Sequence, residues 1–186
     1  KGIQAEELIK KYIANHITDH VRVFRLLRPW SELKIAERFS SFPQYFSTFT
    51  SCNKNWKIDQ KEGTPLWCGV CPKCAFVFAC LSAFLPKKTL EGIFGQDLFS
   101  NEKIVPLFRE LLGLAGSKPF ECVGTPEETQ AAFFLTHQRG EYEKTPAMQM
   151  FLTEDLPMMK NPEALVANAL LQKKEHSVPP EYLALL

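Results

Sequence analysis

Residues 68–86 have the sequence CGVCPKCAFVFACLSAFLP, in which three closely spaced cysteines lead directly into an apolar run. A Cys-x2-Cys spacing lets two thiolates face one metal ion, as tetrahedral zinc requires. The run from Ala75 to Leu85 is apolar all round, which predicts a buried helix. Its 11 residues are too few to span a bilayer, which takes about 20. The stretch therefore predicts a metal site joined to a core helix, and no membrane span.

Three of the expected metal ligands are Cys68, Cys71 and Cys74, and a closed tetrahedral site needs a fourth. Cys52 is the candidate, because it ends an expected strand segment that can present it rigidly. Four thiolates around one Zn²⁺ leave no position for water, so such a site would be structural. Pro72 is a typical first helical residue, and the positive end of that helix would offset the thiolate charge. The alternative is a set of unligated or redox-active thiols, since Cys-x2-Cys also occurs in thioredoxin-like sites.

The composition predicts one folded, soluble chain. Its 186 residues are 45% hydrophobic and 23% charged, with a formal net charge of +1. Because the basic surplus is so small, we do not expect nucleic acid as a partner. Six cysteines, three of them in one short motif, indicate a metal site in a reducing compartment, so we expect a cytoplasmic protein. The chain opens at Lys1 without a starting Met or a secretory signal, and we expect it to be part of a longer or processed protein.

The N-terminal segment reads as part of an α/β domain. Apolar residues recur at helical spacing over residues 3–17, and residues 21–26 alternate with a period of two, which predicts a helix and then a short strand. Ser31 can cap a second helix that Pro43 stops. Because one strand cannot make a sheet, its neighbours are expected either later in this chain or, in preference, upstream of it.

The rest of the chain is predicted to be mainly helical. One or two short strands are expected around residues 45–50, and a turn at Gly63-Thr64-Pro65. Beyond them, four capping signals each open a helix: Asn101, Thr125-Pro126, Thr145-Pro146 and Asn161-Pro162. The second is the fullest, because Glu128 completes a capping box with Thr125.

The loop before Thr125 is the candidate for chemistry. Residues 116–124 read GSKPFECVG and stand directly before a well-capped helix N-terminus. A helix N-terminus binds anions readily and lowers the pKa of a nearby thiol, which makes Cys122 a candidate functional residue. The alternative is a loop whose glycines only permit the turn.

Four segments together resemble the C-terminal half of the UDP-N-acetylmuramoyl-L-alanyl-L-glutamate epimerases, the MurL family. They are FTSCN at 49–53, WCGVCPKCAF at 67–76, Gly113-Leu114, and KPFECVG at 118–124, and the similarity extends over roughly residues 28 to 135. The cysteine pattern is also similar to the four-cysteine site of the 7-cyano-7-deazaguanine synthases. Both families are associated with an ATP-pyrophosphatase type of nucleotide-binding domain.

The resemblance implies an epimerase that converts the terminal L-Glu of UDP-MurNAc-L-Ala-L-Glu to D-Glu, using ATP and Mg²⁺, in peptidoglycan precursor synthesis. An acyl-adenylate intermediate makes chemical sense, because it removes the carboxylate charge that opposes carbanion formation at the α-carbon. Cys122 and Glu121 are the candidate acid–base pair, and Lys118 is the candidate substrate-binding residue. The resemblance itself assigns none of these roles.

On this interpretation the fold is an α/β remnant followed by a mainly helical region. Residues 1–44 would be the edge of the ATP-pyrophosphatase-like domain, residues 45–86 the zinc segment with its buried helix, and residues 87–186 the helical C-terminal region. The nine glycines of the chain include no adjacent pair, so the Gly-Gly phosphate loop of such a domain is absent. We therefore expect ATP to bind in a missing N-terminal domain, and this fragment alone to be inactive.

Two alternatives follow from the same residues. One is an ATP-dependent enzyme of the 7-cyano-7-deazaguanine synthase type, which the KPFECVG segment and the weak basic charge disfavour. The other is a zinc-stabilised helical interaction module without catalysis, which would expose apolar surface.

Overall fold

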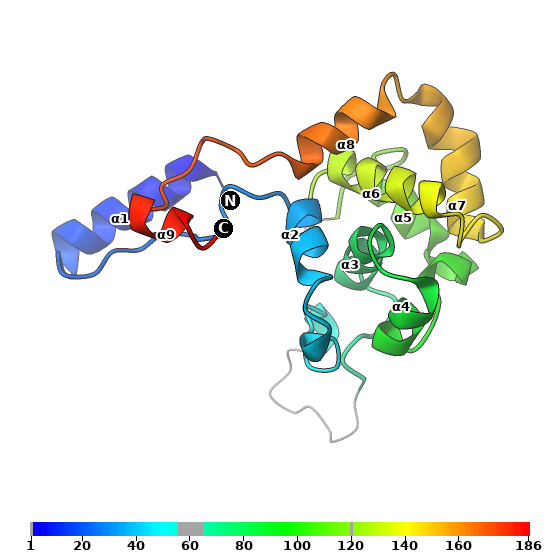
Figure 1. Ribbon diagram of the computed structural model, residues 1–186, viewed down its shortest axis with the longest axis horizontal. Helices are drawn as coiled ribbons and strands as arrows, with labels where there is room; N and C mark the ends of the chain where they lie inside the picture. The colour runs from blue at the N-terminus through cyan, green and yellow to red at the C-terminus, as the bar shows by residue number, and fades with distance from the viewer. Residues whose placement is uncertain (1, 56–64, 120) are drawn as a thin grey trace. The chain divides into compact units, whose positions relative to one another are not determined.

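The computed structural model describes residues 2–55, 65–119 and 121–186, and its ribbon is drawn in Figure 1. Residue contacts divide the chain into two compact units. Unit 1 contains Lys1–Ser31 and Leu171–Leu186, and unit 2 contains Glu32–Leu170. The described residues are mainly helical and none of them lies in a β-strand. The three-part division at residues 44 and 86 is a division by expected role and stays a prediction.

Unit 2 is built from seven α-helices among its described residues, joined by short 3₁₀ turns. Their bounds are α2 Glu32–Phe39, α3 Pro72–Ser82, α4 Lys87–Phe94, α5 Val105–Leu111, α6 Pro126–Arg139, α7 Pro146–Met150 and α8 Pro162–Leu170. The capping signals predict most of these ends correctly. The capping box of Thr125 and Glu128 is present, and α6 ends at Gly140 in the left-handed conformation that glycine adopts easily. No described helix is long and apolar enough to cross a membrane.

The buried helix α3 organises the core of unit 2. It packs against α2, α4, α5 and α6, and most of its residues from Cys74 to Ser82 are buried, as its apolar sequence predicts. Ser82, its one buried hydroxyl, shares a hydrogen bond of 2.7 Å with Thr136 of α6. Because this pair satisfies both buried hydroxyls, α3 and α6 can pack without an unpaired polar group between them.

Aromatic rings fill the space around α3. Phe99 is fully buried. The centroid of its ring lies 4.8–5.1 Å from the ring centroids of four other residues: Phe78, Phe108, Phe133 and Tyr142. Such edge-on and tilted pairs add stability beyond the burial of their area. The four rings that surround Phe99 come from three helices and one turn, so this ring cluster joins several elements of unit 2.

The strand predicted for residues 21–26 is wrong. Unit 1 contains α1 at Ile3–His16, as predicted, and the short α9 at Pro180–Leu183. Residues 21–26 make no ladder, and the backbone N–H of Arg25 instead donates to the buried carboxylate of Glu6 at 3.4 Å. The ring of Phe24 packs on Tyr182, with centroids 4.9 Å apart. A period of two shows only that side chains alternate between two sides of a segment, and here Val21 and Val23 stay exposed while Phe24 packs on α9.

The strands predicted around residues 45–50 are also wrong. Pro43–Tyr45 form a 3₁₀ turn, and the backbone N–H of Phe49 donates to the carbonyl of Tyr45 at 3.1 Å. The N–H groups of Tyr45, Phe46, Thr48 and Phe49 all donate to carbonyls of residues 42–45, so the segment forms turns and not a strand ladder. The turn predicted at Gly63-Thr64 falls outside the described residues.

A buried carboxyl group follows α7, where residues Phe151–Asp155 form a π-helical turn. Asp155 is 2% exposed, and its Oδ1 accepts a hydrogen bond of 2.9 Å from Gln130 of α6. Its Oδ2 is buried without a hydrogen-bond partner in the described structure. Burial raises the pKa of Asp155, although the Gln130 contact lowers it in part.

The raised pKa makes this carboxyl a source of pH-dependent stability. An aspartate that ionises less readily when folded contributes its full stability below the unfolded pKa of about 4, and loses it as the pH rises through the folded pKa. Asp155→Asn removes the ionisation, so we expect a melting temperature about 2–4 °C above wild type at pH 7 and no difference at pH 4. Glu175→Gln is the control for replacing a carboxylate by an amide, because Glu175 is exposed and lies outside the helices. Melting curves that keep the same offset at both pH values would contradict the assignment.

Candidate metal centre

Four cysteine side chains converge in unit 2. The Sγ atoms of Cys52, Cys68, Cys71 and Cys74 all lie within 4.8 Å of one another. Three of the separations are 3.5 Å for Cys71–Cys74, 3.7 Å for Cys68–Cys74 and 3.9 Å for Cys52–Cys71. A tetrahedron with Zn–S bonds of about 2.3 Å has S–S edges of about 3.8 Å. The four sulfurs therefore have the spacing that a metal ion such as zinc needs, and the structure brings together all four predicted ligands.

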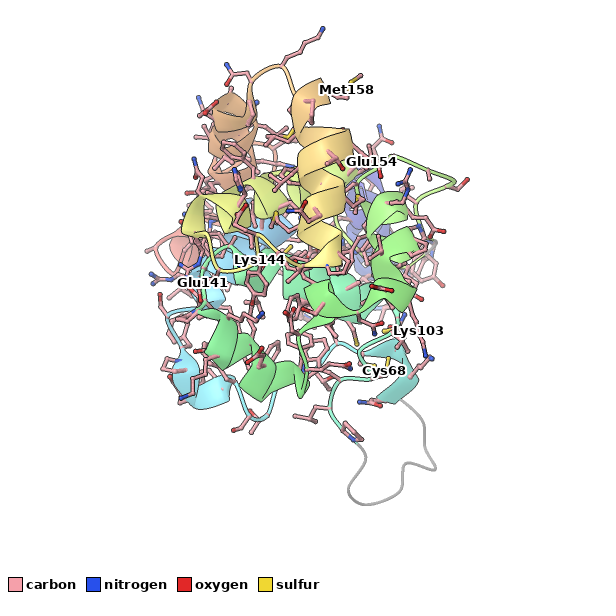
Figure 2. All side chains as sticks on the ribbon, turned by 90° about the vertical axis from the view of Figure 1, so that its right-hand side faces the viewer. Cys68, Lys103, Glu141, Lys144, Glu154 and Met158 are labelled. Carbon is pink, nitrogen blue, oxygen red and sulfur yellow. The ribbon has the colours of Figure 1, made fainter. Side chains whose placement is uncertain are left out.

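The start of α3 positions two of these ligands. Cys71 is the N-cap residue of α3, Pro72 is its first residue, and Cys74 lies in its first turn. Both sulfurs are thus held at the helix N-terminus, where free N–H groups and the positive dipole end favour thiolates. Gly69, in the turn between Cys68 and Cys71, has φ +70°, a conformation that side chains other than glycine rarely adopt. Figure 2 marks Cys68 on the segment that leads into α3.

Local hydrogen bonds fix the fourth ligand. The backbone N–H of Cys52 donates to Thr50 Oγ1 at 3.2 Å, and that hydroxyl donates to the carbonyl of Leu66 at 2.6 Å. The neighbouring Trp67 is 3% exposed and packs against Phe49 and Phe94, with ring centroids 5.1 and 4.6 Å away. Hydrogen bonds and rings therefore join the segment of Cys52 to the segment of Cys68.

The electrostatics of the cluster suit a cation. The hydrogen bond from the Cys74 thiol lowers the pKa of Cys71 to about 4, with a further contribution from the backbone N–H of Cys74. The same contact, together with burial, raises the pKa of Cys74. Burial also raises the pKa of Cys68, against hydrogen bonds from the N–H groups of Val70 and Cys71 that lower it. The Cys71 thiolate thus forms easily, whereas ionisation of Cys68 and Cys74 needs a positive charge nearby, which a metal ion would supply.

The candidate loop lies against the metal-binding segment. Glu121 Oε2 accepts a hydrogen bond of 2.7 Å from the side-chain amide of Asn53, which directly follows Cys52. Cys122 is exposed, and the Lys118 ammonium donates to the carbonyl of Val123 at 3.1 Å. In the described structure no hydrogen bond or ion pair joins the side chains of these three predicted residues to one another.

Glu128 anchors the end of this loop. Its Oε2 accepts from the N–H of Thr125 at 2.8 Å, and its Oε1 accepts from the N–H of Glu32 at 2.9 Å. One carboxylate therefore caps the N-termini of both α6 and α2, where negative charge is stabilising. The sequence predicts the first of these contacts through the capping box. The second contact joins two residues that are 96 apart in the sequence, and no sequence pattern predicts it.

Gly124 lies close to the Glu128 carboxylate and to the ring of Phe76. A Cβ atom there would lie 2.5 Å from the ring of Phe76 and 2.2 Å from Glu128 Oε2. We expect Gly124→Ala to lower the free energy of unfolding by about 2 kcal/mol, because the added Cβ clashes with the buried ring of Phe76 and with the carboxylate that caps α6. Urea denaturation checks this, with Gly92→Ala as control, since Gly92 lies in α4 with nothing within 4 Å of a Cβ. A Gly124→Ala protein as stable as Gly92→Ala would contradict the tight packing of the loop.

Cys80 is separate from the metal cluster. It is 2% exposed in α3 and lines a mainly apolar pocket of about 200 Å³ with residues of α2, Phe49 and Ser51. Burial raises the pKa of Cys80 well above its ordinary value. Because only the thiolate is a good nucleophile, this thiol behaves as a core residue.

Comparisons with known proteins identify the family to which this sequence is similar. A family model described as the MurL C-terminal domain matches residues 48–166, which include the four cysteines and the candidate loop. A UDP-N-acetyl-alpha-D-muramoyl-L-alanyl-L-glutamate epimerase from Micromonospora sp. is 36% identical over 182 residues, covering 98% of this chain and 40% of the relative. The protein of the same name from Xanthomonas oryzae pv. oryzae is 34% identical over 180 residues, covering 97% of this chain and 40% of the relative. No solved structure matches the chain.

A third relative, of the same name and from Salinispora tropica, is 38% identical over 152 residues, covering 82% of this chain and 33% of the relative. This chain thus spans about two fifths of the length of the first two relatives. It belongs to the MurL family of UDP-N-acetylmuramoyl-L-alanyl-L-glutamate epimerases and carries the family's C-terminal domain.

Proposed function

We propose that this chain is the C-terminal part of an epimerase that converts the terminal L-Glu of UDP-MurNAc-L-Ala-L-Glu to D-Glu, a step in peptidoglycan precursor synthesis. The observation that carries the proposal is the family match over residues 48–166. Similarity to a protein named as this epimerase extends over 98% of the chain. The reaction places the protein in the cytoplasm, where nucleotide-linked precursors and reduced thiols coexist, and all six cysteines are unpaired here.

The chemistry proposed is an adenylate-assisted inversion. The terminal α-carboxylate attacks the α-phosphate of ATP, with Mg²⁺ on the phosphates, and gives an acyl-adenylate and pyrophosphate. A base removes the α-proton to form an enolate, and an acid returns a proton to the opposite face. Water then hydrolyses the acyl-adenylate to the D-glutamate carboxylate and AMP. Each turnover consumes one ATP and leaves the substrate isomerised.

ATP and Mg²⁺ are assigned to a nucleotide-binding domain outside this chain. The support is the missing Gly-Gly pair and the length of the relatives, of which this chain matches two fifths. Residues 1–44 would be the C-terminal edge of that domain, which is of the ATP-pyrophosphatase type, and this chain by itself would be inactive.

The residues of this chain would supply proton transfer, substrate contact and a rigid support. Glu121 and Cys122 are the proposed acid–base pair, and Lys118 the proposed contact to a substrate anion. Glu121 is hydrogen-bonded, Cys122 is exposed, and Lys118 holds its own loop through Val123. Zinc bound by Cys52, Cys68, Cys71 and Cys74 would serve a structural role, because four protein thiolates complete its coordination.

The test uses the full-length protein with UDP-MurNAc-L-Ala-L-Glu, ATP and Mg²⁺ in heavy water. We expect substrate-dependent release of AMP, and deuterium at the α-carbon of a product that contains D-glutamate. Cys122→Ala and Glu121→Gln should each lower kcat by at least about a hundredfold, the usual contribution of a general acid or base. Absence of both AMP and deuterium would refute the epimerase, whereas full activity of both variants would refute only the residue assignment.

A further inference from the structure

We propose that the metal centre positions Glu121 through Asn53, which makes Asn53 a positioning residue of the reaction. The inference deepens the proposed function, because it takes Glu121 as one of the proton-transfer residues. Asn53 and Glu121 are 68 residues apart in sequence, and the Asn53 amide donates to Glu121 Oε2 at 2.7 Å. A carboxylate can only accept, so the NH₂ group of Asn53 must face it.

The metal-binding segment holds Asn53 from its N-terminal side. Cys52, the residue before it, is fully buried, and its carbonyl accepts the N–H of Asn55 at 3.1 Å. The same Cys52 is tied through Thr50 to the carbonyl of Leu66, beside the segment of Cys68. A metal ion on the Cys52 sulfur would add a further bond to this turn. The backbone position of Asn53 is thus set by groups that do not touch the loop of Glu121, and the Asn53 amide reaches Glu121 from that fixed position.

Other contacts hold the loop of Glu121 against the same centre. The Lys118 ammonium and the N–H of Val123 bind carbonyls within the loop, at 3.1 and 2.8 Å. Gly124 is packed against Phe76, five residues after Cys71 in the sequence that starts α3. The loop end is therefore anchored on one helix of the metal centre, and the Glu121 carboxylate is anchored on the turn of Cys52.

This arrangement explains what a four-thiolate site would contribute beyond stability. Proton transfer depends steeply on the position of the acid or base, and a displacement of about 1 Å can cost a hundredfold in rate. An exposed loop carries no such precision by itself, whereas a carboxylate hydrogen-bonded to a metal-held turn does. Loss of the Asn53 amide should therefore act on the chemical step and leave substrate affinity unchanged.

The first test compares Asn53→Ala with Asn55→Ala in the full-length, zinc-loaded protein. Asn55 is in the same 3₁₀ turn, but its amide donates to Pro65 and not to Glu121. We expect Asn53→Ala to lower kcat about tenfold, as the loss of one hydrogen bond to a charged group predicts. Its KM and zinc content should stay at the wild-type values, and Asn55→Ala should behave as wild type. An equal loss in both variants would show a general effect of the turn and overturn the proposal.

The second test separates this proposal from the role of Glu121. If Asn53 acts through Glu121, then Asn53→Ala should not lower kcat further in a Glu121→Gln background. Additive losses would overturn the positioning role. If Glu121→Gln alone is fully active, the proposed acid–base role fails instead.

A third measurement does not depend on turnover. Hydrogen–deuterium exchange of the peptide spanning residues 117–125 should be about tenfold faster in Asn53→Ala than in wild type, with both loaded with zinc. Chelation of the zinc in wild type should accelerate exchange of the same peptide further, because loss of the metal is expected to unfold the unit around it. Asn53→Asp serves where Asn53→Ala does not fold, because it keeps the size of the side chain and places a carboxylate against Glu121. Unchanged exchange in a folded variant and in the chelated protein would overturn the proposal.

Discussion

Cys74→Ser is expected to abolish metal binding and to unfold most of unit 2. Cys74 is fully buried at the start of α3, and its sulfur lies 3.5 and 3.7 Å from those of Cys71 and Cys68. Structural zinc contributes about 10–16 kcal/mol to the folding of small zinc-binding peptides. That is as much as the whole stability of an ordinary domain, about 5–15 kcal/mol. Loss of one ligand should therefore leave a chain without stable tertiary packing.

The measurements are zinc content after dialysis and near-ultraviolet circular dichroism. Wild type should hold one zinc per chain and show a strong aromatic signal, and Cys74→Ser should lack both. Cys122→Ser is the control, because this cysteine is exposed and is not part of the cluster. A Cys74→Ser protein that keeps stoichiometric zinc and an unchanged aromatic signal would contradict the four-thiolate centre.

Phe99→Ala is expected to lower the free energy of unfolding by about 4 kcal/mol, typical of a fully buried phenylalanine. Phe99 is 0% exposed and contacts four other rings, which come from α3, α5, α6 and the turn before α7. The cavity left behind cannot close without moving several helices, so the cost should be near the upper end of the usual range. The melting temperature should fall by about 10 °C.

Phe42→Ala is the control, because it makes the same substitution at an exposed phenylalanine. Phe42 is 36% exposed beside Arg38, and its loss should change the melting temperature by no more than about 2 °C. Equal losses at Phe99 and Phe42 would mean that the ring cluster is not the centre of the core. Urea titrations of both variants give the free energies directly.

The helices could be predicted because their signals are local. The capping box at Thr125, the proline at the start of α3 and the apolar run that follows it each act within a few residues, and the structure confirms all three. The two predicted strands failed because a strand needs a partner that lies elsewhere. The alternating pattern at residues 21–26 and the aromatic segment at 45–50 resemble strands, but the first bonds to Glu6 of α1 through Arg25 and the second closes its hydrogen bonds locally.

The candidate site divides in the same way. The spacing of Cys68, Cys71 and Cys74 predicts their grouping, and Cys52 could be added as the remaining ligand upstream. The contact between Asn53 and Glu121 has no counterpart in the sequence, because the two residues meet only after both segments pack around α3. Unit 1 is likewise assembled from both ends of the chain, which no local pattern indicates.

X-ray absorption at the zinc edge of the purified full-length protein tests the metal centre most directly. We predict one zinc per chain with four sulfur neighbours at about 2.3 Å and no nitrogen or oxygen ligand. Cys52→Ser should replace one of these sulfurs or release the metal. A zinc ion bound mainly by nitrogen or oxygen, or a fully reduced protein that takes up no metal at all, would contradict the centre on which both the fold of unit 2 and the placement of Glu121 depend.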